Sequence, residues 1–167
     1  RTFIEVWSEP KARTFTIFVF LSMLAYSAQD LILEPFAGAV HGMSPGKTTQ
    51  LSGWHHMGVL VGMLCVAGAS SRWVAGRLGS VHAWMLGGCI FSALATVGLS
   101  ASAMEMLSFQ WPLKANVVFL GVANGAFSIA AIATMMSLAG EGGSGREGTR
   151  MGLWGAAQAL AFGLGGL

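Results

Sequence analysis

Apolar residues along this chain fall into long continuous runs that are separated by short polar connections. Five runs lie at about residues 14–40, 51–71, 80–103, 113–139 and 150–167. A helix needs about 20 mainly apolar residues to cross the hydrocarbon core of a bilayer. Helices are favoured because each backbone polar group must be paired within its own segment where no water is present. The pattern predicts an all-α, polytopic transmembrane helix bundle.

The composition supports a membrane protein over a soluble one. Of the 167 residues, 54% are hydrophobic and only 10% are charged, whereas soluble domains have about 25% charged residues. This disfavours a soluble enzyme, a disordered tail and a disulfide scaffold. The net charge of +2 is too small to indicate a nucleic-acid partner. The chain begins without Met and ends inside an apolar run, so we expect a fragment of a longer protein.

Basic residues are divided unequally between the two ends of the predicted helices. Seven Lys and Arg residues lie in the N-terminal tail and in the connections around 72–79 and 140–150, whereas only Lys47 and Lys114 lie on the other side. Because short basic connections remain in the cytoplasm, the N-terminal tail is predicted to be cytoplasmic.

The first apolar run carries polar side chains that are costly inside a membrane. Tyr26, Gln29, Asp30 and Glu34 recur at spacings of three and four, so they share one helical face. A carboxylate at the bilayer centre costs about 2.5–3.5 kcal/mol, so the acidic pair is expected to face protein or water. Pro35 follows and predicts a kink or break. Two interpretations stay open: bonding to neighbouring helices near the outer interface, or a proton- or ligand-linked site.

Polar residues in the later runs are further candidates for an intramembrane site. Asn124 lies in the fourth run, and Arg150, Trp154 and Gln158 follow one another at four-residue spacing in the fifth. That spacing makes one stripe, which is expected to face and hydrogen-bond a neighbouring helix.

Small residues indicate where the helices approach one another. Gly58 and Gly62 form a GxxxG pair in the second run, and Gly121 and Gly125 form another in the fourth. Such spacing allows close contact between helix backbones. The pairs are assigned to helix packing, either within the bundle or in a specific dimer.

The four histidines, His41, His55, His56 and His82, lie close to the ends of the predicted runs. A neutral imidazole is a common metal ligand, and it could be an axial ligand to the magnesium of a chlorophyll. Ala37, four residues before His41, leaves room for a macrocycle. The alternative interpretation is that each histidine is a hydrogen-bonding group at the membrane interface.

Known catalytic and metal-binding motifs are absent from the sequence. There is no HExxH, no paired CxxC and no nucleophile elbow. We therefore expect neither catalytic residues nor a metal site, and we predict that the chain is not an enzyme.

Two stretches point to a family. Residues 22–35 read SMLAYSAQDLILEP and continue through Phe36-Ala37-Gly38 to SPGKTTQLSG at 44–53, and residues 150–159 read RMGLWGAAQA. They resemble the PucC/LhaA family, the bacteriochlorophyll-delivery branch of the major facilitator superfamily. The resemblance covers nearly the whole chain. It implies a protein of twelve membrane helices, of which residues 1–167 hold about five from the C-terminal half, without the N-terminal half and the last helix.

The resemblance also implies a function. Such a protein would be an assembly factor for light-harvesting antenna complexes in the intracytoplasmic photosynthetic (inner) membrane of a bacterium. Bacteriochlorophyll would be its bound or transient cofactor, and antenna polypeptides, the reaction centre and membrane lipids would be its partners. Two alternatives remain: a proton-coupled secondary transporter of a small solute that uses Asp30 or Glu34, and a structural subunit of a photosynthetic supercomplex.

Overall fold

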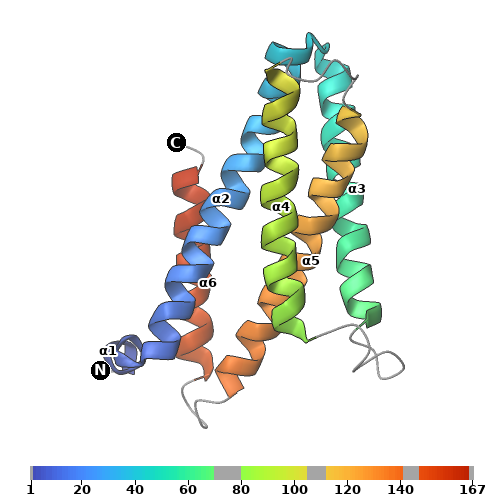
Figure 1. The fold of residues 1–167 in the computed structure, drawn as a ribbon. Helices are drawn as coiled ribbons and strands as arrows, with labels where there is room; N and C mark the ends of the chain where they lie inside the picture. The colour runs from blue at the N-terminus through green and yellow to red at the C-terminus, as the bar shows by residue number, and fades with distance from the viewer. Residues whose placement is uncertain (1, 70–79, 105–111, 141–146, 166–167) are drawn as a thin grey trace. The chain divides into compact units, whose positions relative to one another are not determined.

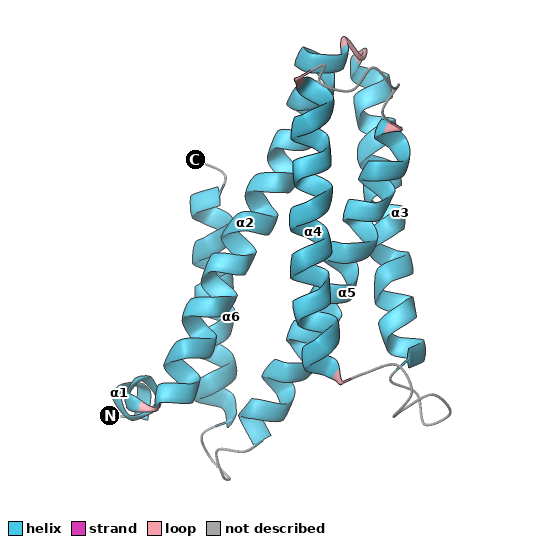
Figure 2. Cartoon of the chain, in the orientation of Figure 1, coloured by secondary structure: helices cyan, strands magenta, loops and turns pink. Residues whose placement is uncertain are grey.

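The computed structural model describes residues 2–69, 80–104, 112–140 and 147–165, and these residues are almost entirely helical. No strand occurs in them, which confirms the predicted all-α bundle (Figure 2). The helices in order are α1 (Thr2–Ser8), α2 (Pro10–His41), α3 (Pro45–Ala69), α4 (Val81–Ala103), α5 (Leu113–Gly140) and α6 (Glu147–Gly165) (Figure 1).

Among the described helices, α2, α3, α4 and α5 are long and apolar enough to cross a membrane. The chain is therefore an integral membrane protein. The fifth predicted run corresponds to α6, which has 19 residues and is not one of these four. Glu147, Arg150 and Gln158 lower its apolar character. The ends of two predicted runs, 70–71 and 166–167, lie outside the described residues, as do the basic connection 72–79 and most of 140–150.

Helix α3 begins at Pro45 instead of near Leu51. Proline is well suited to the first position of a helix because the N–H that it lacks would have no partner there. The Ser44 carbonyl accepts from the backbone N–H groups of Lys47 and Thr48 at 2.8 and 3.0 Å. The polar start of α3 is thus helical although it is too polar to appear in a hydropathy run.

A kink or a break was expected at Pro35, and the break does not occur, since α2 continues through this residue to His41. A proline removes one backbone donor but its fixed φ is compatible with a helix. The chain instead turns at Gly42, whose φ of 61° lies in the left-handed region. That conformation favours glycine.

The chain divides into two compact units, which we describe separately. The first unit contains residues 1–32 and 132–167, and the second contains residues 33–131. The first unit therefore holds α1, most of α2, the end of α5 and α6. The second unit holds α3, α4, most of α5 and the end of α2.

The second unit is built on a close contact between α3 and α5. At four glycines on these helices, an added Cβ would collide with a backbone carbonyl of the other helix, so their backbones lie in direct contact. The four contacts are Gly58 with Val118, Gly62 with Val122, Gly121 with His55 and Gly125 with Val59. The structure thus places both GxxxG pairs within the bundle.

In the first unit, α2 and α6 run side by side in the same direction (Figure 1). The rings of Phe15 and Trp154 meet edge to face at 5.1 Å. Further along, a Cβ on Gly165 would lie 2.8 Å from the Ser27 hydroxyl. Helix α1 packs against α6.

Candidate functional site

A buried histidine on α3 and a buried asparagine on α5 form the centre of a polar network in the second unit. His55 is 1% exposed and Asn124 is 4% exposed. The Asn124 side-chain nitrogen lies 3.4 Å from His55 Nε2. Its carbonyl oxygen accepts a hydrogen bond from the Ser92 hydroxyl on α4 at 2.7 Å. One amide therefore links three helices, because it donates on one side and accepts on the other.

The glycine contacts explain why this network can form. Gly121 lies against the backbone carbonyl of His55, and Asn124 follows Gly121 by three residues on the same helix. Residues three apart lie on one helical face. A residue larger than glycine at position 121 would push α5 away from His55, and the amide would no longer reach the imidazole.

A second asparagine on α5 strengthens the contact with α4. Asn116 donates to the Ala95 carbonyl at 3.0 Å. In membranes such interhelical side-chain bonds contribute about 0.6 kcal/mol on average and about 1.7 kcal/mol at most. Polar side chains along α5 thus hold α4 and α3 in a defined register.

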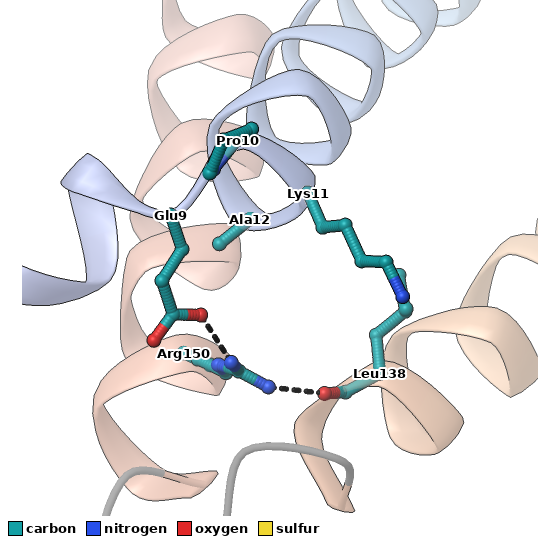
Figure 3. A pocket seen from close by; sticks show the side chains of 6 residues that line it. All are labelled: Glu9, Pro10, Lys11, Ala12, Leu138 and Arg150. Carbon is teal, nitrogen blue, oxygen red and sulfur yellow. Dashed lines mark hydrogen bonds and ion pairs between the residues drawn. The ribbon is translucent and has the colours of Figure 1, made fainter.

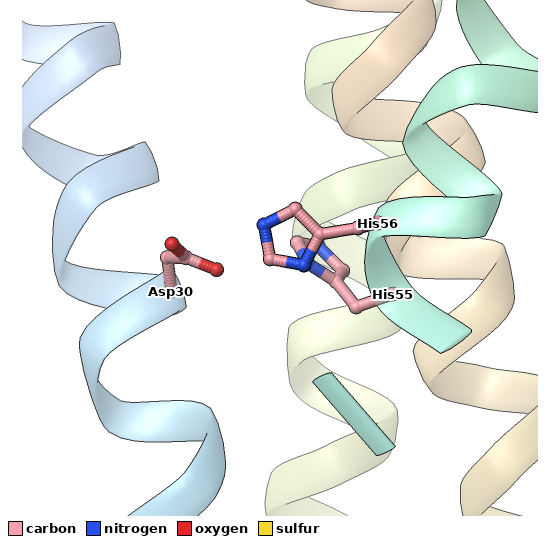
Figure 4. A group of neighbouring side chains, drawn as sticks. All are labelled: Asp30, His55 and His56. Carbon is pink, nitrogen blue, oxygen red and sulfur yellow. The ribbon is translucent and has the colours of Figure 1, made fainter. Parts of the chain in front are cut away.

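The other three histidines are exposed. The His56 ring meets the His55 ring edge to face at 5.4 Å on α3 (Figure 4), and its Nδ1 lies 2.9 Å from the Ser52 carbonyl. His41 Nε2 lies 3.3 Å from the Ser102 hydroxyl. His82 lies in the first turn of α4. The sequence pattern does not distinguish the four histidines, whereas in the structure His55 is the buried one among them.

The polar face predicted on α2 is half-buried along its length. Tyr26, Gln29, Asp30 and Glu34 are each partly exposed. In the first unit the Tyr26 ring meets Phe162 of α6 edge to face at 6.5 Å. For Asp30 and Glu34, bonding to neighbouring helices and a proton- or ligand-linked site therefore both stay predictions.

The stripe on α6 lies against α2. Gln158 donates to the Met23 sulfur at 3.5 Å, and Trp154 contacts Phe15. At the start of the stripe, Arg150 contacts Glu9, which directly precedes α2, and Leu138 of α5.

Arg150 joins three segments of the first unit at one end of its helices (Figure 3). Its guanidinium forms an ion pair with the Glu9 carboxylate, and it donates to the Leu138 carbonyl of α5 at 2.6 Å. Glu9 was not among the residues that the sequence pattern indicated. Its position directly before Pro10 marks a helix start, but no local pattern indicates a partner 141 residues away.

Comparison with known proteins identifies the family. The family described as PUCC protein matches residues 1–167, so the chain belongs to this family. This confirms the resemblance found in the sequence. No solved structure matches the chain.

Three relatives come from Rhodobacter capsulatus. The chain is 53% identical to the "Bacteriochlorophyll synthase 44.5 kDa chain" over 98% of its own length and 37% of that protein. It is 32% identical to an "Uncharacterized protein in puhA-bchM intergenic region" over 98% of its length and 33% of the relative. It is 30% identical to "Protein PucC" over 87% of its length and 30% of the relative. The chain thus spans about a third of the length of these relatives.

The name of the first relative contradicts the expectation that the chain is not an enzyme. A protein 53% identical to it is named as a chain of a synthase. That expectation was based on the absence of three motifs from the sequence: HExxH, paired CxxC and the nucleophile elbow. Those motifs report only metal- and nucleophile-dependent chemistry, so their absence does not exclude catalysis of another kind.

The histidines differ in how well they fit the magnesium of a bacteriochlorophyll. His55 does not fit, because its ring is enclosed and its Nε2 faces Asn124. His56 fits in kind. Its ring is exposed, and an Nδ1–H that donates to the Ser52 carbonyl places the lone pair on Nε2. Metal-bound histidines are commonly oriented by such a bond from the other ring nitrogen to a backbone carbonyl.

Proposed function

We propose that this protein handles bacteriochlorophyll in a photosynthetic membrane and assists the assembly of light-harvesting antenna complexes. The observation that carries the proposal is the match of the whole chain to the PUCC family. The relatives named bacteriochlorophyll synthase chain and PucC support a bacteriochlorophyll-related role. The antenna polypeptides and the reaction centre are proposed as partners, and the intracytoplasmic photosynthetic membrane as the location, with the N-terminal tail in the cytoplasm.

The outer surface of α3 suits contact with a pigment. Leu60 and Leu64 follow His56 at four-residue spacing and are 52% and 62% exposed. Ser52 and Gly53, which precede His56, take up little space, because serine has a small side chain and glycine has none. A bacteriochlorophyll held there would be bound through His56, and the exposed leucines would supply an apolar surface for it. The bound group would supply the pigment that is handed on, while the chain supplies the ligand and the apolar surface.

The proposal is tested on the full-length protein purified from photosynthetic membranes in mild detergent. We expect bacteriochlorophyll bands in its absorption spectrum and antenna or reaction-centre polypeptides among the co-purifying proteins. Pigment that persists after the antenna has been stripped would identify a carrier. A colourless protein without photosynthetic partners would contradict the proposal and favour a solute transporter, which uptake assays would then examine.

A second candidate follows from the name of the 53% identical relative. In this case the protein would be a membrane chain of the apparatus that makes bacteriochlorophyll. Pigment extracts of a deletion strain separate the two functions. Accumulated precursors would favour a part in synthesis, whereas mature bacteriochlorophyll without assembled antenna would favour assembly.

A further inference from the structure

Helix α1 lies across the beginning of α2 in the first unit. In Figure 1 α1 is seen nearly end-on, whereas α2 runs along the plane of the picture, so the two helix axes are transverse. Glu9 is the single residue between the two helices. Its backbone N–H donates to the Val6 carbonyl at 3.2 Å, and its carbonyl accepts from the Arg13 N–H at 3.0 Å. Helix α1 is therefore joined to α2 without an intervening loop.

The junction of α1 and α2 lies at the depth of a membrane surface. Helix α2 is long and apolar enough to cross a membrane, and its apolar run begins near Thr14, about four residues after Pro10. Four helical residues rise about 6 Å. The headgroup region on each side of the hydrocarbon core is about 5–8 Å deep. A helix that lies across the start of α2 is therefore located in the headgroup region.

The sides of α1 differ in chemistry. Ile4 and Trp7 are 69% and 41% exposed, and they share one side because residues three apart lie on one helical face. Glu5 and Ser8 are also exposed and three apart, so they share another side. Val6 is fully buried, and α1 packs against α6. Helix α1 thus has one side held against the protein, one exposed apolar side and one exposed polar side.

We propose that α1 is an interfacial helix that inserts Ile4 and Trp7 into the boundary between lipid headgroups and acyl chains. An amphipathic helix in the membrane plane buries its apolar side at this depth while its polar side faces water. Tryptophan is enriched where membrane spans meet the headgroups. Arg13, exposed in the first turn of α2, is a second residue of the kind that positions a span at the interface.

The test uses the full-length protein, with its native cysteines replaced, in phosphatidylcholine vesicles. Single cysteines are introduced and spin-labelled in four variants: Ile4→Cys, Glu5→Cys, Trp7→Cys and Ser8→Cys. The accessibility of each label to oxygen, which is enriched in the apolar region, is compared with its accessibility to a water-soluble nickel chelate. We expect the ratio of oxygen to chelate accessibility to be higher at positions 4 and 7 than at positions 5 and 8. The two polar positions are the matched controls, because they lie on the same short helix.

A second measurement needs no label and reports the depth of Trp7. Phosphatidylcholine that carries bromine close to its headgroup quenches shallow tryptophans, whereas bromine at the ends of the acyl chains quenches deep ones. The part of the fluorescence that Trp7→Phe removes is expected to be quenched more strongly by the first lipid. High chelate accessibility at all four labelled positions would overturn the proposal, since α1 would then lie in water. Low accessibility to both reagents at positions 4 and 7 would also overturn it, since another protein segment would then cover the apolar side.

Discussion

Each of the two units is stabilised internally by a different kind of contact between its helices. In the second unit, glycines bring the α3 and α5 backbones into direct contact, and one buried amide joins α3, α4 and α5. In the first unit, α2 and α6 meet at two edge-to-face ring pairs, Phe15 with Trp154 and Tyr26 with Phe162, and the Arg150 ion pair lies at one end. The second unit therefore has little freedom to change its helix spacing, whereas the first unit depends on an ion pair that is partly exposed to solvent.

The largest effect is expected where helix backbones touch. Gly62→Ala places a methyl group against the Val122 carbonyl of α5, and the helices must separate to accept it. Overpacking of this kind costs about 1–3 kcal/mol, and a rigid backbone neighbour favours the upper end. We expect a marked loss of thermal stability in detergent.

Gly68→Ala is the matched control for this change. Gly68 lies on the same helix, and an added Cβ there would have no other atom within 4 Å. It should leave stability unchanged or raise it slightly, because alanine favours a helix. Equal melting temperatures for the two variants would show that the α3–α5 contact does not limit stability.

The next largest effect concerns the ion pair of the first unit. The Arg150 and Glu9 side chains are 12% and 28% exposed, so solvent screens the pair only in part. Arg150→Met removes the ion pair with Glu9 and the hydrogen bond to the Leu138 carbonyl. We expect a loss of about 2 kcal/mol, below the 3–5 kcal/mol typical of a fully buried pair. Arg13→Met, at an exposed arginine, should cost less than about 0.5 kcal/mol. Similar melting temperatures for the two methionine variants would contradict the role of the pair.

A smaller effect is expected in the amide network of the second unit. Asn124→Ala removes the contacts to His55 and Ser92, so we expect a loss of about 1 kcal/mol at roughly 0.6 kcal/mol per bond. Ser92→Ala removes one of these bonds and should cost about half as much. Asn116→Ala, which removes one bond to Ala95, serves as a comparison elsewhere on α5. Equal losses for Asn124→Ala and Ser92→Ala in thermal unfolding would indicate that the His55 contact contributes nothing.

The helices of this fold could be predicted from the sequence, whereas the site could be predicted only in part. Apolar runs reveal helices because the bilayer sets their length. GxxxG spacing marks Gly58, Gly62, Gly121 and Gly125 as packing residues but does not say which helix each one meets. His55 and Asn124 are 69 residues apart. Nothing local distinguishes His55 from its neighbour His56, because only the register of α3 on α5 decides which ring is enclosed.

That difference between neighbouring histidines gives the prediction with the smallest effect on stability. His56 is exposed and its Nδ1 bonds within its own helix, to Ser52. Substitutions at exposed positions usually change the free energy of unfolding by less than about 0.5 kcal/mol, and we expect an effect of this size for His56→Leu. If His56 ligates bacteriochlorophyll, the same variant should lower the pigment-to-protein ratio of the purified full-length protein. The absorption spectrum, normalised to protein, measures this directly.

His82→Leu is the matched control, because His82 is also exposed but lies in the first turn of α4. It should leave both stability and pigment unchanged. Loss of pigment in His56→Leu alone would place the ligand on the outer surface of α3, on the unit whose helix spacing the glycines fix. Equal pigment in the two variants would leave His56 as a hydrogen-bonding group at the membrane interface, and the pigment site would then have to lie elsewhere in the full-length protein.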